Sequence, residues 1–154
     1  MSTRCSTNPR IHVAEPRRHE QGLVDTSVVI DLSEIDPADL PRDLAISAVT
    51  LAELAAGPHA ATDPEERARR QDRLQRAEAA FEPLPVDGAV ARAYGRVYAA
   101  VAAAGRKARG RRALDLLIAA TALAAGLPLY TRNADDFADL DHLVEVVAVP
   151  VRAA

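Results

Sequence analysis

The sequence has 154 residues, of which 49% are hydrophobic, and these values are typical of one globular domain with a single core. Its formal net charge of −3 does not fit a non-specific nucleic-acid binder, so any site for a polyanion must be local. Aromatic residues make up only 3% and tryptophan is absent, which argues against a stacking platform for bases.

The single cysteine, Cys5, excludes an internal disulfide and a cluster of thiolates around a metal. No run approaches the roughly 18 consecutive apolar residues that span a membrane. The start of the chain also lacks the apolar core of a secretion signal. We therefore expect a cytoplasmic protein with no membrane contact. Residues 1–21 are polar and predict a disordered leader, residues 22–150 the domain itself, and residues 151–154 a tail.

The domain is expected to open with a short strand over residues 22–25, which ends at Asp25 and runs into a helix from Thr26. A loop with two prolines follows. The apolar residues 45–49 then predict a second strand.

Three helices are expected in the middle of the chain. Thr50 and Glu53 have the spacing of a helix start, and Gly57 with Pro58 should interrupt that helix. A charged helix should then run from Asp63 to about residue 81. A brief third strand is predicted over 84–86. It is followed by a helix that Asp87 caps and Gly105 ends, with apolar residues at helical spacing: Val90, Tyr94, Val97, Tyr98 and Val101.

Residues 106–112 carry five positive charges in seven positions, which is consistent either with a solvated loop or with a local polyanion site. Residues 113–123 then predict a buried helix that is apolar nearly all round and ends at Gly126. Strands are expected at 128–131 and 144–149, with a polar turn and short helix between them. This alternation predicts an α/β fold with a mainly parallel central sheet of about four to five strands and helices on both faces.

Acidic residues recur where the predicted strands end or the next helices begin: Asp25, Glu53, Asp115, and Asp135 or Asp136. The carboxyl ends of parallel strands share one sheet edge, so these acids should meet there. Each acid alone has a structural explanation as a cap or turn residue. Together, clustered carboxylates repel one another unless a cation neutralises them. The scattered histidines do not suit zinc, so Mg²⁺ or Mn²⁺ is expected, with phosphodiester hydrolysis as the chemistry.

Four sequence blocks, in this order, resemble the PIN-domain ribonucleases and in particular VapC-type toxins: Leu23 to Val28, Thr50 to Leu54, Asp115 to Ala122, and Thr131 to Phe137. The resemblance covers nearly the whole chain from Gly22 onward. It implies four catalytic acids, Asp25, Glu53, Asp115 and Asp136, with Asp135 as the alternative to the last. Of these, Asp25, Asp115 and Asp136 would hold the metal. It further implies a site border at Asn133, orienting hydroxyls at Thr26 and Thr131, and an RNA contact at Arg112.

The resemblance also implies a function, an endoribonuclease that inhibits translation by cutting tRNA, rRNA or mRNA. Its partner would be a VapB-type antitoxin, and a homodimer could form through the surface of Tyr94, Val97, Tyr98 and Val101, although these residues also suit the core. Two alternatives are a catalytically silent PIN-like module that binds RNA or protein, and a haloacid-dehalogenase-like phosphatase. The latter needs a second aspartate two residues after Asp25, where Ser27 stands.

Overall fold

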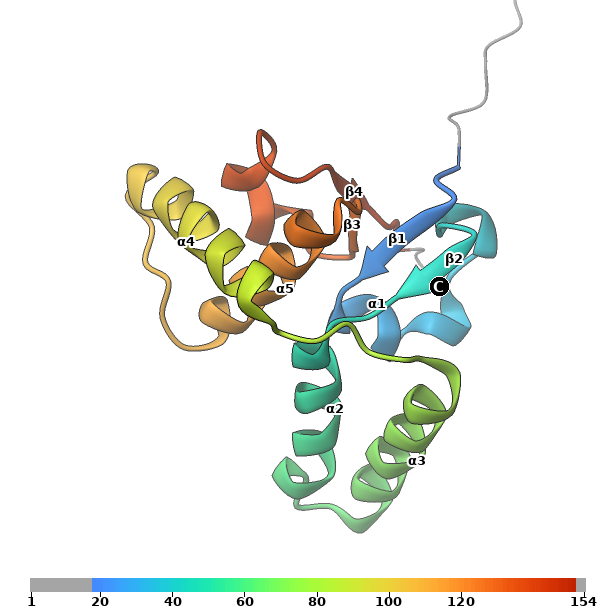
Figure 1. The fold of residues 1–154 in the computed structure, drawn as a ribbon. Helices are drawn as coiled ribbons and strands as arrows, with labels where there is room; N and C mark the ends of the chain where they lie inside the picture. The colour runs from blue at the N-terminus through green and yellow to red at the C-terminus, as the bar shows by residue number, and fades with distance from the viewer. Residues whose placement is uncertain (1–17, 152–154) are drawn as a thin grey trace, which may run out of the picture.

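The computed structural model describes residues 18–151, and in this range the strands form one parallel sheet with helices packed on both sides (Figure 1). The strands are β1 (Gln21–Val24), β2 (Asp43–Ala45), β3 (Leu129–Thr131) and β4 (Val146–Ala148). Their order across the sheet is β2-β1-β3-β4, so the two central strands are β1 and β3. The predicted parallel α/β sheet is confirmed.

The helices are α1 (Thr26–Ile30), α2 (Ala48–Ala60), α3 (Pro64–Ala80), α4 (Gly88–Ala103) and α5 (Arg111–Ala125). Three 3₁₀ segments complete the described structure: Leu32–Glu34, Pro37–Asp39 and Ala134–Leu140. Figure 1 shows α2 and α3 as a pair beyond one end of the sheet, while α4 and α5 pack together at its side. None of the helices in residues 18–151 is long and apolar enough to cross a bilayer.

Successive residues of the central strands point to opposite faces of the sheet, and each face has its own core. Leu23 and Leu129 belong to a core with the buried residues of α4 and α5. Val24 and Tyr130, the next residue on each strand, belong to a second core with α1 and the inner side of α2 and α3. The expectation of helices on both faces is therefore confirmed, and β1 and β3 are fixed from two sides.

The second strand lies earlier than predicted, because the chain turns into a helix at Ser47. The Ser47 hydroxyl accepts a hydrogen bond from the Val49 backbone N–H at 3.1 Å and caps α2. Thr50 is buried inside the helix, so the predicted helix start at Thr50 and Glu53 is wrong. As a consequence, Glu53 lies in the second turn of α2.

Two further predictions in this part of the chain are wrong for reasons that involve proline. Helix α2 continues through Gly57 and Pro58 to Ala60, because the proline comes so near the end of the helix that few backbone hydrogen bonds remain to be broken. The strand expected over 84–86 is a single bridge between Leu84 and Ser47. The residues on either side of Leu84 are both prolines, which have no N–H to donate to a longer ladder.

The last residues of the predicted leader belong to the fold. The Arg18 Nε donates a hydrogen bond to the Leu40 carbonyl at 2.7 Å, and Gln21 opens β1. The rest of the leader, residues 1–17, and the tail residues 152–154 lie outside the described residues.

Gly22 leaves no room for a side chain, so Gly22→Ala should destabilise the domain. A Cβ atom there would lie 2.7 Å from Cε2 of the buried Tyr130 ring and 3.0 Å from Cγ of Pro41. We expect the free energy of unfolding to fall by about 1–3 kcal/mol, measured by urea denaturation. Gly95→Ala is the matched control, because that exposed position in α4 has nothing within 4 Å and should gain about 0.5–1 kcal/mol. Equal stability of the two variants would contradict the prediction.

Candidate active site

Asp25 lies at the carboxyl end of β1, where it caps α1, and its side chain is only 5% exposed. Its Oδ1 accepts hydrogen bonds from the Ser27 hydroxyl at 2.5 Å and from the Val28 N–H at 3.2 Å. Its Oδ2 accepts one from the Thr131 hydroxyl at 2.6 Å. Both carboxylate oxygens are thus held in place by donors from β3 and from the start of α1.

The two hydroxyls beside Asp25 are themselves oriented by the backbone. The Arg132 N–H donates to the Ser27 Oγ at 3.1 Å, and the Asn133 N–H donates to the Thr131 Oγ1 at 3.0 Å. Since each oxygen accepts from the backbone, its own proton remains available for the carboxylate. The segment after β3 therefore fixes the direction of the Asp25 side chain.

Glu53 is positioned from α2. The Thr26 hydroxyl donates a hydrogen bond to Glu53 Oε1 at 2.8 Å, and the Thr50 hydroxyl lies 3.1 Å from that of Thr26. The start of α1 therefore holds two acids: Asp25 is its N-cap, and its first residue, Thr26, donates to Glu53.

Asp115 comes from α5 and Asp136 from the 3₁₀ segment after β3, and both face the same pocket as Asp25 and Glu53. This pocket has a volume of about 410 Å³. Its lining residues are Asp25, Thr26, Ser27, Ile30, Asp31, Glu53, Arg111, Asp115, Asn133 and Asp136. We call it the acidic pocket.

The acids of this pocket influence one another's charge. Burial, and then the charges of Glu53, Asp136 and Asp25, raise the pKa of Asp115 to about 6, while Arg111 acts in the opposite direction. Burial also raises the pKa of Asp25, against the lowering effect of its hydrogen bonds from Ser27 and Thr131. Four carboxylates from distant parts of the chain therefore lie within electrostatic reach.

Most of the site residues predicted from the sequence meet here, Asp136 among them, and the exceptions are Thr131 and Arg112. Asp136 lines the pocket and Asp135 does not. Thr131 is fully buried, so its hydroxyl can orient Asp25 but is not accessible to a substrate. Arg111, and not Arg112, lines the pocket.

Four residues of the pocket wall were not among the predicted site residues: Ser27, Ile30, Asp31 and Arg111. Arg111 is four positions before Asp115, and residues at this spacing lie on the same side of a helix. That spacing was the available signal for Arg111. Ser27 had no comparable signal, because its role depends on an N–H from a segment 105 positions away.

The donors in the acidic pocket fit a hard cation such as Mg²⁺ or Mn²⁺, because they are all oxygen atoms. Within residues 18–151, no three carboxylate, imidazole or thiolate groups are already arranged to enclose a metal ion. This does not conflict with Mg²⁺, which commonly takes one or two carboxylates and fills its other positions with water and phosphate oxygens.

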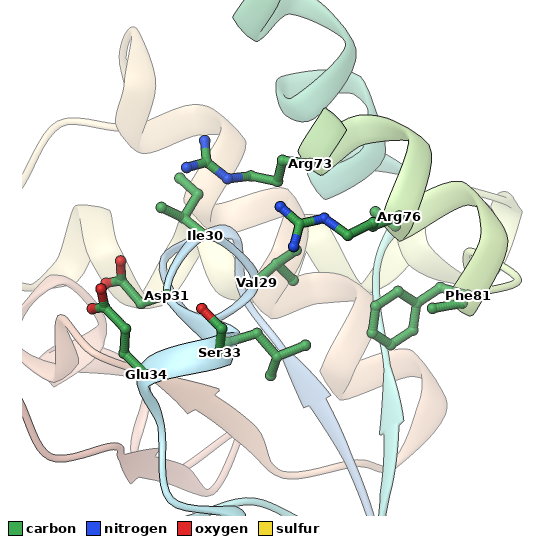
Figure 2. Close-up of a pocket in the computed structure, with 11 residues that line it drawn as sticks. Val29, Ile30, Asp31, Ser33, Glu34, Arg73, Arg76 and Phe81 are labelled. Carbon is green, nitrogen blue, oxygen red and sulfur yellow. The ribbon is translucent and has the colours of Figure 1, made fainter. Parts of the chain in front are cut away.

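A second pocket, of about 460 Å³, adjoins the acidic one and shares Ile30 and Asp31 with it. Figure 2 shows Arg73 and Arg76 reaching over it from α3, opposite Asp31 and Glu34. Charges of both signs line this pocket, and none of the predicted site residues does. The acids singled out in the sequence therefore line the acidic pocket and not this second one.

Comparison with known proteins places this geometry in a family. The family model for the PIN domain matches residues 22–143. Ribonuclease VapC5 of Mycobacterium tuberculosis is 40% identical over 133 residues, which are 84% of this chain and 95% of that protein. Ribonuclease VapC4 of the same organism is 36% identical over 132 residues, covering 84% of this chain and 97% of the relative.

Solved structures agree with the sequence comparison. A crystal structure of VapBC-5, a member of the VapBC family of toxin–antitoxin systems from Mycobacterium tuberculosis, matches with a TM-score of 0.72 and 40% identity. The match covers 86% of this chain and 99% of the solved one. The chain belongs to the PIN domain family and, within it, to the VapC group.

Proposed function

We propose that this protein is a metal-dependent endoribonuclease that hydrolyses RNA phosphodiester bonds in the acidic pocket. The observation that carries the proposal is the meeting of the four predicted acids, from four separate segments, around one open pocket that a fifth carboxylate, Asp31, also lines. The names of the VapC5 and VapC4 relatives, both ribonucleases, support RNA as the substrate.

Each acid has a distinct part in this proposal. Asp25, Asp115 and Asp136 would hold Mg²⁺ or Mn²⁺, and the hydroxyls of Ser27 and Thr131 keep Asp25 in the orientation needed. When bound, the cation polarises the phosphate and lowers the pKa of the attacking water. Glu53, held by the Thr26 hydroxyl, accepts a proton from that water as the general base. The Arg111 guanidinium stabilises negative charge on the phosphate from the pocket wall.

We further propose that the protein is the toxin of a VapBC-type pair and inhibits translation by cutting RNA. The similarity to a solved VapBC toxin–antitoxin system supports a VapB-type antitoxin as its partner. Fewer residues of α4 are available for a homodimer surface than the sequence predicted. Val97 and Val101 are buried in this chain's own core, Tyr94 is half-buried, and Tyr98 is the one exposed side chain of the four expected residues.

Substitution of the pocket acids should abolish cleavage, because each neutral amide removes a ligand charge. We expect Asp115→Asn and Asp136→Asn each to lower the rate of RNA cleavage about 100-fold or more. Asp135→Asn is the matched control, since its side chain does not line the pocket, and should stay within about twofold of wild type. The assay incubates the purified protein with total RNA and Mg²⁺ or Mn²⁺, with and without EDTA.

The outcomes separate the competing functions. Cleavage that survives EDTA and both pocket substitutions would contradict the metal mechanism. No cleavage under any condition would favour a silent PIN-like module. Growth arrest on expression, relieved by Asp115→Asn, is the result expected of a toxin.

Without metal, the acidic pocket should make the protein less stable as the pH rises. Asp115 has a pKa of about 6 in the folded protein and an ordinary value of 3.8, so the folded state binds more protons between these values. Its contribution to stability therefore declines as the pH rises from about 4 to 6 and stays low above that range. In EDTA at pH 7, Asp115→Asn should be more stable than wild type by about 1–2 kcal/mol, after allowance for solvent screening.

Urea unfolding at pH 4 and pH 7, with EDTA or with Mg²⁺, measures this effect. The advantage of Asp115→Asn should shrink at pH 4 and also when Mg²⁺ is added, because either condition relieves the repulsion in wild type. Asp135→Asn serves again as the control. A difference between wild type and Asp115→Asn that is the same at both pH values would show that Asp115 is not perturbed.

A further inference from the structure

We propose that the α4–α5 turn (residues 104–110) and the exposed ring of Tyr98 form a second RNA-binding surface, which holds backbone phosphates and one base outside the acidic pocket. The inference rests on the proposed function, because it takes RNA as the substrate. It concerns binding and not cleavage, and the two can be measured separately.

The two ends of the turn are fixed by glycines in conformations that other residues rarely adopt. Gly105 has φ +75°, its N–H donates to the Ala102 carbonyl at 3.0 Å, and the next N–H, of Arg106, donates to Val101 at 3.1 Å. This hydrogen-bond pattern is a common helix ending and folds the turn back beside the last turns of α4. At the other end, Gly110 has φ +60° and is the N-cap that precedes α5.

The middle of the turn is also attached to the domain. The Arg106 Nε forms an ion pair with Asp139 Oδ2 at 3.0 Å, and Ala108 packs against the core of α4 and α5. Lys107 and Arg109 lie on either side of Ala108, and both are exposed. In the part of the chain that the structure describes, neither cation has an ion-pair or hydrogen-bond partner. The turn thus presents two unpaired positive charges on an anchored backbone.

An aromatic ring lies beside these charges. Tyr98 is 50% exposed, and a small pocket of about 130 Å³ lies between its side chain and the turn, lined by Arg106, Lys107 and Arg109 among others. The neighbouring Tyr94 ring, with its centroid 6.2 Å away, supports Tyr98 from within α4. Single-stranded nucleic acids are bound by this combination, in which cations contact the phosphates and a base stacks on an aromatic face.

The charge distribution explains why such a surface is needed. A pocket lined by five carboxylates, in a protein of net charge −3, repels a polyanion, and cations outside the pocket offset this repulsion. The α4–α5 turn leads directly into Arg111, which lines the acidic pocket. Figure 1 shows the turn as an outer loop from the end of α4 to the start of α5, away from α3. Positive charge therefore continues along the chain from Lys107 to the edge of the acidic pocket.

The phosphate contacts are tested by the salt dependence of binding. Binding of a fluorescently labelled single-stranded RNA is followed by anisotropy in EDTA, so that no cleavage is required, at several salt concentrations. For Lys107→Gln/Arg109→Gln we expect the slope of log K against log salt to decrease in magnitude by about 1.4, about 0.7 for each lost phosphate contact. The control Arg73→Gln/Arg92→Gln removes the same charge from α3 and the first half of α4, and should leave the slope unchanged.

The base contact is tested at Tyr98. Tyr98→Ala should weaken RNA binding about fivefold or more without changing the salt slope, whereas Tyr98→Phe, which keeps the ring, should bind like wild type. Because the side chain is half exposed, both variants should fold, which thermal unfolding checks. Size-exclusion chromatography of the same variants shows whether the ring belongs to an interface between copies.

Several results would overturn the inference. Absence of RNA binding by wild type, or equal slopes for Lys107→Gln/Arg109→Gln and its control, would exclude the turn as a phosphate site. Tyr98→Ala that dissociates a dimer and leaves RNA affinity unchanged would assign the ring to self-association. Equally tight binding of phosphatidylserine vesicles, with the same dependence on Lys107 and Arg109, would exclude a surface specific for RNA. Wild type that binds with the expected slope but never cuts would contradict the proposed nuclease and leave this surface intact.

Discussion

The structure depends on a buried negative charge, that of Asp25, at the point where β1 and β3 end side by side. Burying a carboxylate is unfavourable unless it is paired or hydrogen bonded, and here three donors reach it, one of them from β3. The hydrogen bond from the Asp25 N–H to the Tyr130 carbonyl at 3.0 Å joins the same two strands through their backbones. The stabilisation of this charge therefore requires the native pairing of the two central strands, which lie about 100 positions apart in the sequence.

The topology of the sheet places the other acids of the pocket near Asp25. Parallel strands end at one edge of the sheet, and the helices that follow begin near that edge. Helix α2 supplies Glu53, α5 supplies Asp115 and the segment after β3 supplies Asp136. The charges of Glu53, Asp136 and Asp25 each raise the pKa of Asp115, so these carboxylates lie close enough to repel one another. A domain selected only for stability would not be expected to keep this repulsion, which a cation bound in the pocket would relieve.

The sequence predicted the sheet, the helices on both faces and the acids because these features depend on local patterns: apolar runs, helix periodicity and polar residues at strand ends. It did not predict the residues whose place depends on contacts made across the fold. Ser47 and Thr50 both offer a hydroxyl that could start α2. Ser47 is the cap in the structure, where its Oγ also lies 3.2 Å from the Thr121 hydroxyl of α5 and its residue bridges Leu84. Arg111 is a different case, because it lies four residues before Asp115 on α5, a local relation that the prediction of Arg112 overlooked.

The start of α5 separates opposite charges that are close together in the sequence. Residues 106–112 are strongly basic and Asp115 follows closely, so an unfolded chain would place these charges together. In the folded protein, Gly110 divides them: the cations before it lie on an outer turn, while Asp115 faces the acidic pocket from α5. Arg111 is the one cation of this run that lines the pocket, and it partly counteracts the rise in the pKa of Asp115. A positive surface for a polyanion and a negative pocket for a cation can therefore be built from neighbouring residues, because the backbone turns at Gly110 between the basic loop and α5.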